Sequence, residues 1–170
     1  MRRGVLVLLI AAAAGCSAAA LAGDAAEPVL GWDELKSLVG TWEGAEAGHA
    51  HGVSVTYRLV SNGSALMESM DVPGHSETMV TMYAPDSPTG RIVATHYCAA
   101  GNQPRMAAKR IRGDTLDFQF LDATNAGAES ELMRSLRIRF LDPDHFEQLW
   151  TSRSNGRDHA ATFTWARKKK

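Results

Sequence analysis

Residues 134–165, RSLRIRFLDPDHFEQLWTSRSNGRDHAATFTW, carry the pattern that decides the fold. Apolar and polar residues alternate through this stretch with a period of two, which is typical of strands that bury one face. The turns Asp142-Pro143-Asp144 and Ser154-Asn155-Gly156-Arg157 interrupt the alternation. Asn-Gly favours a type I′ hairpin, because both central positions of that turn need positive φ. We therefore predict three consecutive antiparallel strands, near 134–141, 145–153 and 158–167.

The same twofold period extends back to residue 41, with turn residues about every ten positions. It predicts seven earlier strands, near 41–47, 53–60, 64–71, 77–84, 91–99, 105–112 and 115–123. About ten strands joined mostly by short turns would leave exposed edges in an open sheet, and closure removes those edges. We expect an all-β protein, an antiparallel up-and-down barrel of about ten strands.

A short helix is predicted before the first strand. Trp32, Leu35, Leu38 and Val39 follow helical spacing, and Gly40 ends the pattern. The helix and the strands together indicate a single barrel domain over residues 32–170.

The strands of such a barrel place alternate residues inside. The clearest inward sets are Leu116, Phe118 and Phe120; Leu136, Ile138 and Phe140; and Ala161, Phe163 and Trp165. Asp117, Gln119, Arg137 and Arg139 are then expected to face water. Even eight-stranded barrels can hold a small ligand, so a barrel of about ten strands predicts an internal cavity. Met67, Met70, Met79 and Met82 alternate on adjacent strands and are candidates for either packed core or an adaptable apolar pocket.

The N-terminus has the features of an export signal. Residues 1–22 combine a basic start at Arg2 and Arg3, an apolar run, and an A-x-A cleavage site ending at Ala22. Ala13-Ala14-Gly15-Cys16 also resembles a bacterial lipobox, which would make Cys16 a lipidated N-terminus. Residues 23–31 would form a small-residue linker. We expect an exported protein, either periplasmic or anchored to the outer membrane as a lipoprotein.

Charge and composition exclude several classes. The 170 residues carry a formal net charge of −1, and cleavage after Ala22 would leave 148 residues near −3. Nucleic acid is an unsuitable partner, because its binding usually requires a basic excess. The apolar run of the leader is too short for a transmembrane helix, and no later stretch has enough uncharged residues to replace it. Cys98 would be the single thiol of a chain without Cys16, so no internal disulfide is expected.

Gly40-Thr41-Trp42-Glu43-Gly44, after a short helix and at the start of the first strand, resembles the Gly-x-Trp motif of the calycin superfamily, the lipocalin and fatty-acid-binding-like barrels. The number of strands is closer to the fatty-acid-binding and nitrobindin-like members. The stretch from Thr95 to Met106 resembles a group of exported bacterial proteins of unknown function with this barrel. The resemblance implies that Trp42 packs over the closed end. The nitrobindin-like resemblance further implies a haem held by a histidine on a late strand, for which His159 is the nearest candidate.

A polar loop near residues 100–105 supplies candidate ligand contacts. Asn102, Gln103 and Arg105 could hydrogen-bond the polar end of a ligand at a barrel mouth, since functional groups often lie on loops held by a rigid scaffold. The alternative is that the amides satisfy loop backbone groups and that Arg105 is a surface charge.

His96 and Cys98 share one face of a strand and are candidates for ligand or metal contact. Pairing about the turn at 85–90 would bring residue 77 opposite roughly residue 98, so His75 and Glu77 could complete a metal site. The alternative is a hydrogen-bonded histidine and a buried apolar cysteine, because free cysteine is among the most buried residue types.

No nucleophile elbow, phosphate loop, CxxC pair or HExxH motif occurs in the sequence. The sequence therefore favours a role other than catalysis, in which a small apolar or amphipathic molecule binds inside the barrel without a cofactor. Two alternatives stay open: a haem or metal protein that uses the histidines, and an envelope scaffold or interaction protein without a ligand.

Overall fold

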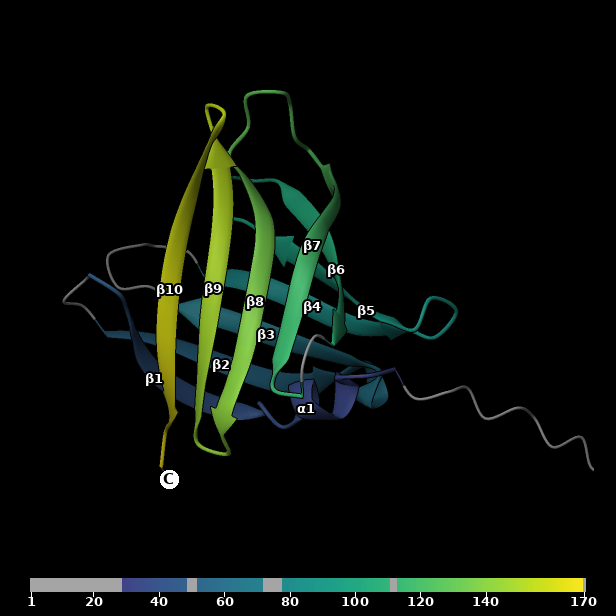
Figure 1. The fold of residues 1–170 in the computed structure, drawn as a ribbon, viewed down its shortest axis with the longest axis vertical. Coiled ribbons are helices and arrows are strands. Elements are labelled where there is room, and N and C mark those ends of the chain that lie inside the picture. The colour runs from purple at the N-terminus through teal and green to yellow at the C-terminus, as the bar shows by residue number, and fades with distance from the viewer. Residues whose placement is uncertain (1–28, 49–51, 72–77, 111–112, 170) are drawn as a thin grey trace, which may run out of the picture.

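The computed structural model describes residues 29–48, 52–71, 78–110 and 113–169, whose strands close into one antiparallel barrel (Figure 1). Each strand pairs with its neighbours along the chain, and the first strand pairs with the last. The strands are β1 (Gly40–Glu46), β2 (Gly52–Val60), β3 (Ala65–Asp71), β4 (Met79–Asp86), β5 (Arg91–Tyr97), β6 (Gln103–Arg110), β7 (Thr115–Thr124), β8 (Leu132–Asp142), β9 (His145–Ser154) and β10 (Arg157–Arg167). The predicted ten-stranded up-and-down barrel is confirmed.

Turn chemistry sets many of these pairings. Asn155 and Gly156, between β9 and β10, have φ values of 51° and 74°, as the predicted type I′ hairpin requires. The connection between β2 and β3 differs, because Ser61–Gly63 forms a short 3-10 turn, η1. All three of its residues have positive φ, and the Ser64 backbone N–H donates to the Ser61 carbonyl at 3.2 Å. This connection is therefore longer than a two-residue hairpin.

The β4–β5 register is two residues away from the one predicted. Thr81 lies opposite His96, whereas the predicted register would place Thr81 opposite Ala94. The reason is a tight turn in which the Thr89 backbone N–H donates to the Asp86 carbonyl at 3.2 Å. The Thr89 hydroxyl also donates to the Asp86 carboxylate at 2.5 Å. The turn therefore begins after Asp86, and Pro85 stays in the strand.

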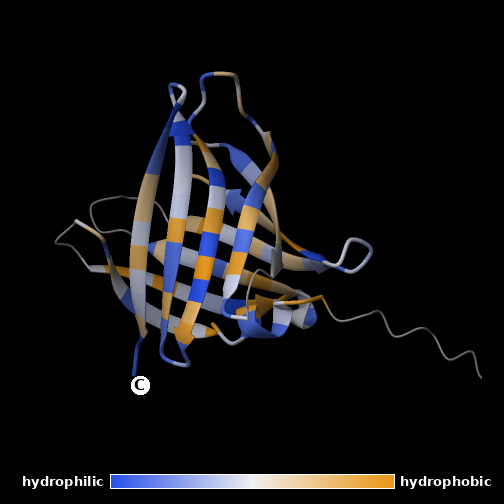
Figure 2. Cartoon of the chain, in the orientation of Figure 1, coloured by the Kyte–Doolittle hydropathy of each residue, from blue (hydrophilic) through white to orange (hydrophobic). Residues whose placement is uncertain are grey.

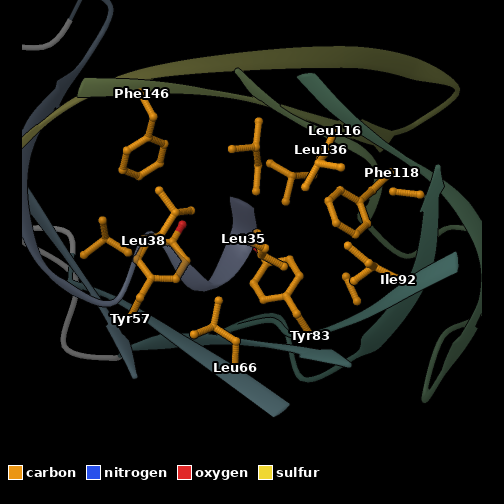
Figure 3. Packing of buried hydrophobic residues seen from close by; sticks show 14 of the residues in the cluster. Leu35, Leu38, Tyr57, Leu66, Tyr83, Ile92, Leu116, Phe118, Leu136 and Phe146 are labelled. Atoms are coloured by element: carbon orange, nitrogen blue, oxygen red, sulfur yellow. The ribbon is translucent and has the colours of Figure 1, made fainter. Parts of the chain in front are cut away.

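The predicted helix is present but shorter than residues 32–39. α1 spans Trp32–Lys36, and Gly31 precedes it with φ 87°. The side chains of Leu35 and Leu38 are 0% and 2% exposed, so both still join the core although Leu38 lies beyond the helix. Figure 3 shows α1 within the ring of strands, with these leucines among the aromatic rings. α1 therefore closes one end of the barrel.

Trp42 also closes this end. Its indole N–H donates to the Leu38 carbonyl at 2.8 Å, and the Arg167 guanidinium lies 4.0 Å from the centre of its ring. Arg167 further donates to the backbone carbonyls of Ser37 and Val39 at 2.9 and 3.1 Å. These contacts tie the segment after α1 to the end of β10 by hydrogen bonds and a cation–π contact.

The second glycine of the Gly-x-Trp-x-Gly stretch has a steric reason. A Cβ at Gly44 would lie 2.2 Å from the Thr164 carbonyl oxygen and 2.6 Å from the Trp165 ring. Any larger residue would push β1 away from β10. The segment before the helix is equally tight, because a Cβ at Gly31 would lie 2.5 Å from Leu116, and Val29 is 9% exposed. The last residues of the expected linker thus pack onto the barrel.

Hydrophobic and hydrophilic residues alternate along the strands, as the colours of β8 show in Figure 2, and the buried hydrophobic residues form one core cluster. Most of the predicted inward residues are buried, namely Leu116, Phe118, Leu136, Ile138, Phe163 and Trp165, whereas Phe120, Phe140 and Ala161 are half-buried. A register shift between Arg105 and Met106 marks a bulge in the β6–β7 ladder. Leu121 is the extra, unpaired residue of this bulge on β7 and is 43% exposed.

Within the described part of the chain, no helix is long and apolar enough to cross a membrane.

Candidate functional site

A cavity of about 440 Å³ occupies the half of the barrel farther from α1. Its exposed lining residues Ala99, Ala100 and Glu131 mark the mouth, and the nearly fully buried Glu68 and Thr81 mark the inner end. The volume falls in the range of small-molecule sites. Among the described residues, the lining consists of Glu46, Glu68, Met70, Met79, Thr81, His96, Cys98, Ala99, Ala100, Glu131, Met133, Trp150, Ser152, Ala161 and Phe163.

The inner end of the cavity meets a buried hydrogen-bond network around Glu68, which is 1% exposed. The Tyr83 hydroxyl donates to one Glu68 carboxylate oxygen at 2.5 Å, and the Gln148 amide donates to the other at 3.1 Å. The same amide nitrogen is 2.9 Å from the Tyr57 hydroxyl. The Trp165 indole N–H donates to the Gln148 amide oxygen at 3.0 Å. Residues from five strands thus join one hydrogen-bond network around a buried carboxylate.

Burial is the largest cause of the pKa shifts of the acidic groups in this network. Desolvation raises the pKa of Glu68 above its ordinary value, although the hydrogen bonds from Tyr83, Gln148 and Tyr57 oppose the rise. Desolvation and the neighbouring carboxylate also raise the pKa of Tyr57 and Tyr83, so both hydroxyls stay protonated and remain donors. The network therefore gives Glu68 several donors in place of water.

His96 lines the cavity next to this network and is 4% exposed. Its Nδ1 lies 2.9 Å from the Thr81 hydroxyl, its pairing partner across the ladder. Burial lowers the pKa of His96 from 6.5 to about 4, so the imidazole is neutral at pH 7. Its other ring nitrogen, Nε2, is buried and has no hydrogen-bond partner among the described residues. A buried polar atom without a partner is uncommon in folded proteins.

Trp150 presents a second atom of this kind. Its ring lies against the His96 ring, with centroids 5.0 Å apart and planes tilted by 48°. Its indole nitrogen is also buried, again without a partner in the described part of the chain. Trp150 and His96 both line the cavity, so two polar ring atoms without partners come from neighbouring side chains of one site.

The remaining cavity wall is mainly apolar. Met70 and Met79 are opposite each other across the β3–β4 ladder, and both line the cavity together with Met133. Met67 and Met82 pair three positions further along the same ladder, so they lie on the opposite face of the sheet and outside the lining. Flexible thioether side chains suit an adaptable apolar surface.

Cys98 lies near the mouth, where it is a half-buried free thiol. It lines the same cavity as His96, as their shared strand face predicted. His96 lies deeper and Cys98 lies beside the exposed Ala99. The structure therefore arranges the two residues along the cavity axis.

The polar loop residues are divided between different surroundings. Arg105 faces outward and forms an exposed bidentate ion pair with Asp122. Gln103 accepts a hydrogen bond from the Thr124 hydroxyl at 2.6 Å. Neither residue belongs to the cavity lining. Asn102 is 2% exposed and donates from its amide to the Glu131 carbonyl at 2.8 Å, so it connects this loop to the mouth.

Of the residues named for a metal site, the structure describes His96, Cys98 and His159. His75 and Glu77 lie outside the described residues, and the β4–β5 register differs from the one that suggested them. His159 is exposed at the start of β10 and is absent from the cavity lining. Among the described residues, no group of three or more His, Cys, Asp or Glu side chains is placed to hold a metal ion.

Sequence reasoning missed Glu68, Gln148 and Trp150. A usable signal was present, because Glu68 stands between Leu66 and Met70 at an inward position of its strand. Gln148 stands in the same way between Phe146 and Trp150. Polar residues at inward positions must find partners, so they mark a buried network.

Comparison with known proteins supports the fold. No protein-family model matches the chain, and no curated protein sequence matches it. Among solved structures, the crystal structure of Rv2717c from M. tuberculosis superposes with a TM-score of 0.59 at 16% sequence identity. The match covers 84% of this chain and 100% of that one. At this level of identity the similarity shows a shared β-barrel fold.

Proposed function

We propose that this protein is an exported barrel that binds a small apolar or amphipathic molecule in its cavity. The observation that supports the proposal is the 440 Å³ space lined by methionine and aromatic side chains, beside two ring nitrogens without partners. Such a site combines apolar area with a few polar groups that orient a ligand. The barrel provides the rigid scaffold, and the mouth at Ala99, Ala100 and Glu131 provides the entry path.

A matched pair of substitutions tests the location of binding. Ala161 lines the cavity, whereas Ala160, the next residue of β10, is exposed on the other face of the sheet. Ala161→Phe is expected to fill the cavity and abolish binding of the neutral apolar dye N-phenyl-1-naphthylamine, and Ala160→Phe is expected to leave binding unchanged. Dye binding that survives Ala161→Phe in a folded protein would contradict the proposal.

Cys98 offers an independent measurement. In a chain carrying Cys16→Ser, the rate of Cys98 alkylation by iodoacetamide is expected to fall when the dye fills the cavity. Equal rates with and without saturating dye would place the dye elsewhere.

Mass spectrometry of the N-terminus after expression in a bacterium separately tests export, since cleavage after Ala22 and lipidation at Cys16 give different masses.

Haem binding is a second candidate function, supported by the environment of His96. A haem iron takes a neutral imidazole nitrogen as its axial ligand, and the buried Nε2 of His96 is such an atom without a partner among the described residues. Haem titration followed by its Soret absorbance tests this candidate. A red-shifted band that disappears in His96→Phe would support it, and an unchanged free-haem spectrum would reject it.

A further inference from the structure

The charge of the cavity wall carries information about the ligand. Three carboxylates line the space, from Glu46, Glu68 and Glu131. Within the part of the chain that the structure describes, no lysine or arginine belongs to the lining. A carboxylate ligand would have to lose its hydration without a cationic partner, which is strongly unfavourable. The lining therefore disfavours fatty-acid-like anions.

Two residues of the lining, Trp150 and His96, carry buried ring nitrogens without a hydrogen-bond partner among the described residues, and these nitrogens restrict the ligand further. The indole N–H of Trp150 can only donate a hydrogen bond, so it requires an acceptor. An ammonium group has no acceptor to offer, and it would leave this donor unsatisfied. The neutral His96 beside it can donate or accept at Nε2, depending on its tautomer. An uncharged oxygen, as in a hydroxyl, amide or ester group, satisfies both nitrogens.

We infer that the cavity is selective for amphipathic molecules whose polar end is an uncharged oxygen-containing group, held between Trp150 and His96. This inference rests on the proposed binding function and specifies its ligand class. The apolar part of the ligand would lie against Met70, Met79 and Met133, which share the cavity with the two rings. The carboxylates of Glu46 and Glu131, nearer the surface, would exclude anions at the entrance.

A series of ligands with one chain length tests the inference at pH 7.5. Decan-1-ol, decanamide, decanoate and decylamine would each compete with N-phenyl-1-naphthylamine for the full mature chain. The alcohol and amide are expected to displace the dye at concentrations at least tenfold lower than decanoate and decylamine. Decanoate or decylamine binding as tightly as the alcohol would overturn the inference while the cavity proposal stands. If neither the dye nor any of the four compounds binds, the proposed function itself fails.

Substitution of the donor tests the anchor directly. Trp150→Phe keeps an aromatic ring and removes the N–H, so decanamide affinity is expected to fall about fivefold while dye affinity changes little. Trp32→Phe, on α1 at the other end of the barrel, is the matched control and should change neither affinity. Unchanged decanamide affinity in Trp150→Phe would overturn the role of Trp150.

Discussion

The two halves of this barrel share the same strand alternation, but the interior of one half is filled by side chains and the interior of the other holds a cavity. Near α1, large side chains such as Tyr57, Phe118 and Phe146 meet with exposures of 0–1% and fill the interior (Figure 3). Away from α1, methionine, alanine, serine, threonine and histidine share the cavity lining with Trp150, Phe163 and three glutamates, and a cavity remains. The comparison shows that period alone places residues inside. Their size and polarity decide whether the inside is packed or open.

The Glu68 network lies where the two halves meet. Tyr83 and Tyr57 belong to the packed half through their rings, and their hydroxyls reach the carboxylate that borders the cavity. Rigid aromatic packing therefore positions the donors that replace water around Glu68. A buried polar layer of this kind separates a packed region from a ligand space and must be fully satisfied to be stable.

The largest expected difference between the halves concerns one phenylalanine in each. Phe118→Ala should lower the free energy of unfolding by about 3–5 kcal/mol, because it leaves a void in close-packed surroundings. Phe163→Ala should cost less, since Phe163 is 6% exposed and already borders the cavity. Chemical denaturation of both variants measures the difference. Equal losses would show that the cavity wall is as tightly packed as the filled half.

Acid should weaken the cavity half through His96. Its folded pKa is about 4 against 6.5 for the ordinary group, so the stabilisation is complete above pH 6.5 and is lost as the pH falls toward 4. The shift corresponds to about 3 kcal/mol. Unfolding curves of wild type and His96→Phe at several pH values isolate this contribution. Parallel pH dependence of the two proteins between 6.5 and 4 would contradict it.

A hydroxyl deletion tests the layer between the halves. Tyr83→Phe should cost about 1.5–3 kcal/mol, because it removes a donor from a buried carboxylate. The matched control is Tyr97→Phe, whose side chain is 49% exposed and whose loss of a hydroxyl should be nearly neutral. Denaturant midpoints measure both. A Tyr83→Phe variant as stable as the control would remove the energetic role assigned to the network.

The smallest effect is expected on the outer surface. Arg105→Ala removes an exposed ion pair with Asp122 that lies outside the cavity lining, so binding of the neutral dye should not change. Asp122→Ala breaks the same pair from the other side and serves as the control. If Arg105→Ala lowers dye affinity and Asp122→Ala does not, Arg105 contacts the ligand and the expectation is wrong.

Much of the fold follows from local sequence. The period of two predicted all ten strands. The Asn155-Gly156 pair predicted the hairpin between β9 and β10, and both residues have the positive φ values that this hairpin requires. The site was predicted less completely. His96, in β5, and Cys98, one residue beyond the end of β5, both line the cavity. Asn102, Gln103 and Arg105 are close in sequence, but each contacts a different residue: Asn102 contacts Glu131, Gln103 contacts Thr124 and Arg105 contacts Asp122.

The sequence by itself determined which residues are strands and which of their faces lies inside, because the twofold period and turn preferences act over a few neighbouring residues. Only the tertiary structure decided which inward residues meet. His96 contacts Trp150, and Glu68 contacts Gln148, 80 positions away. Such meetings depend on the register of every strand between them. A bulge or a turn shifted by two residues, as between β4 and β5, changes the contacts across the barrel while leaving the alternation intact.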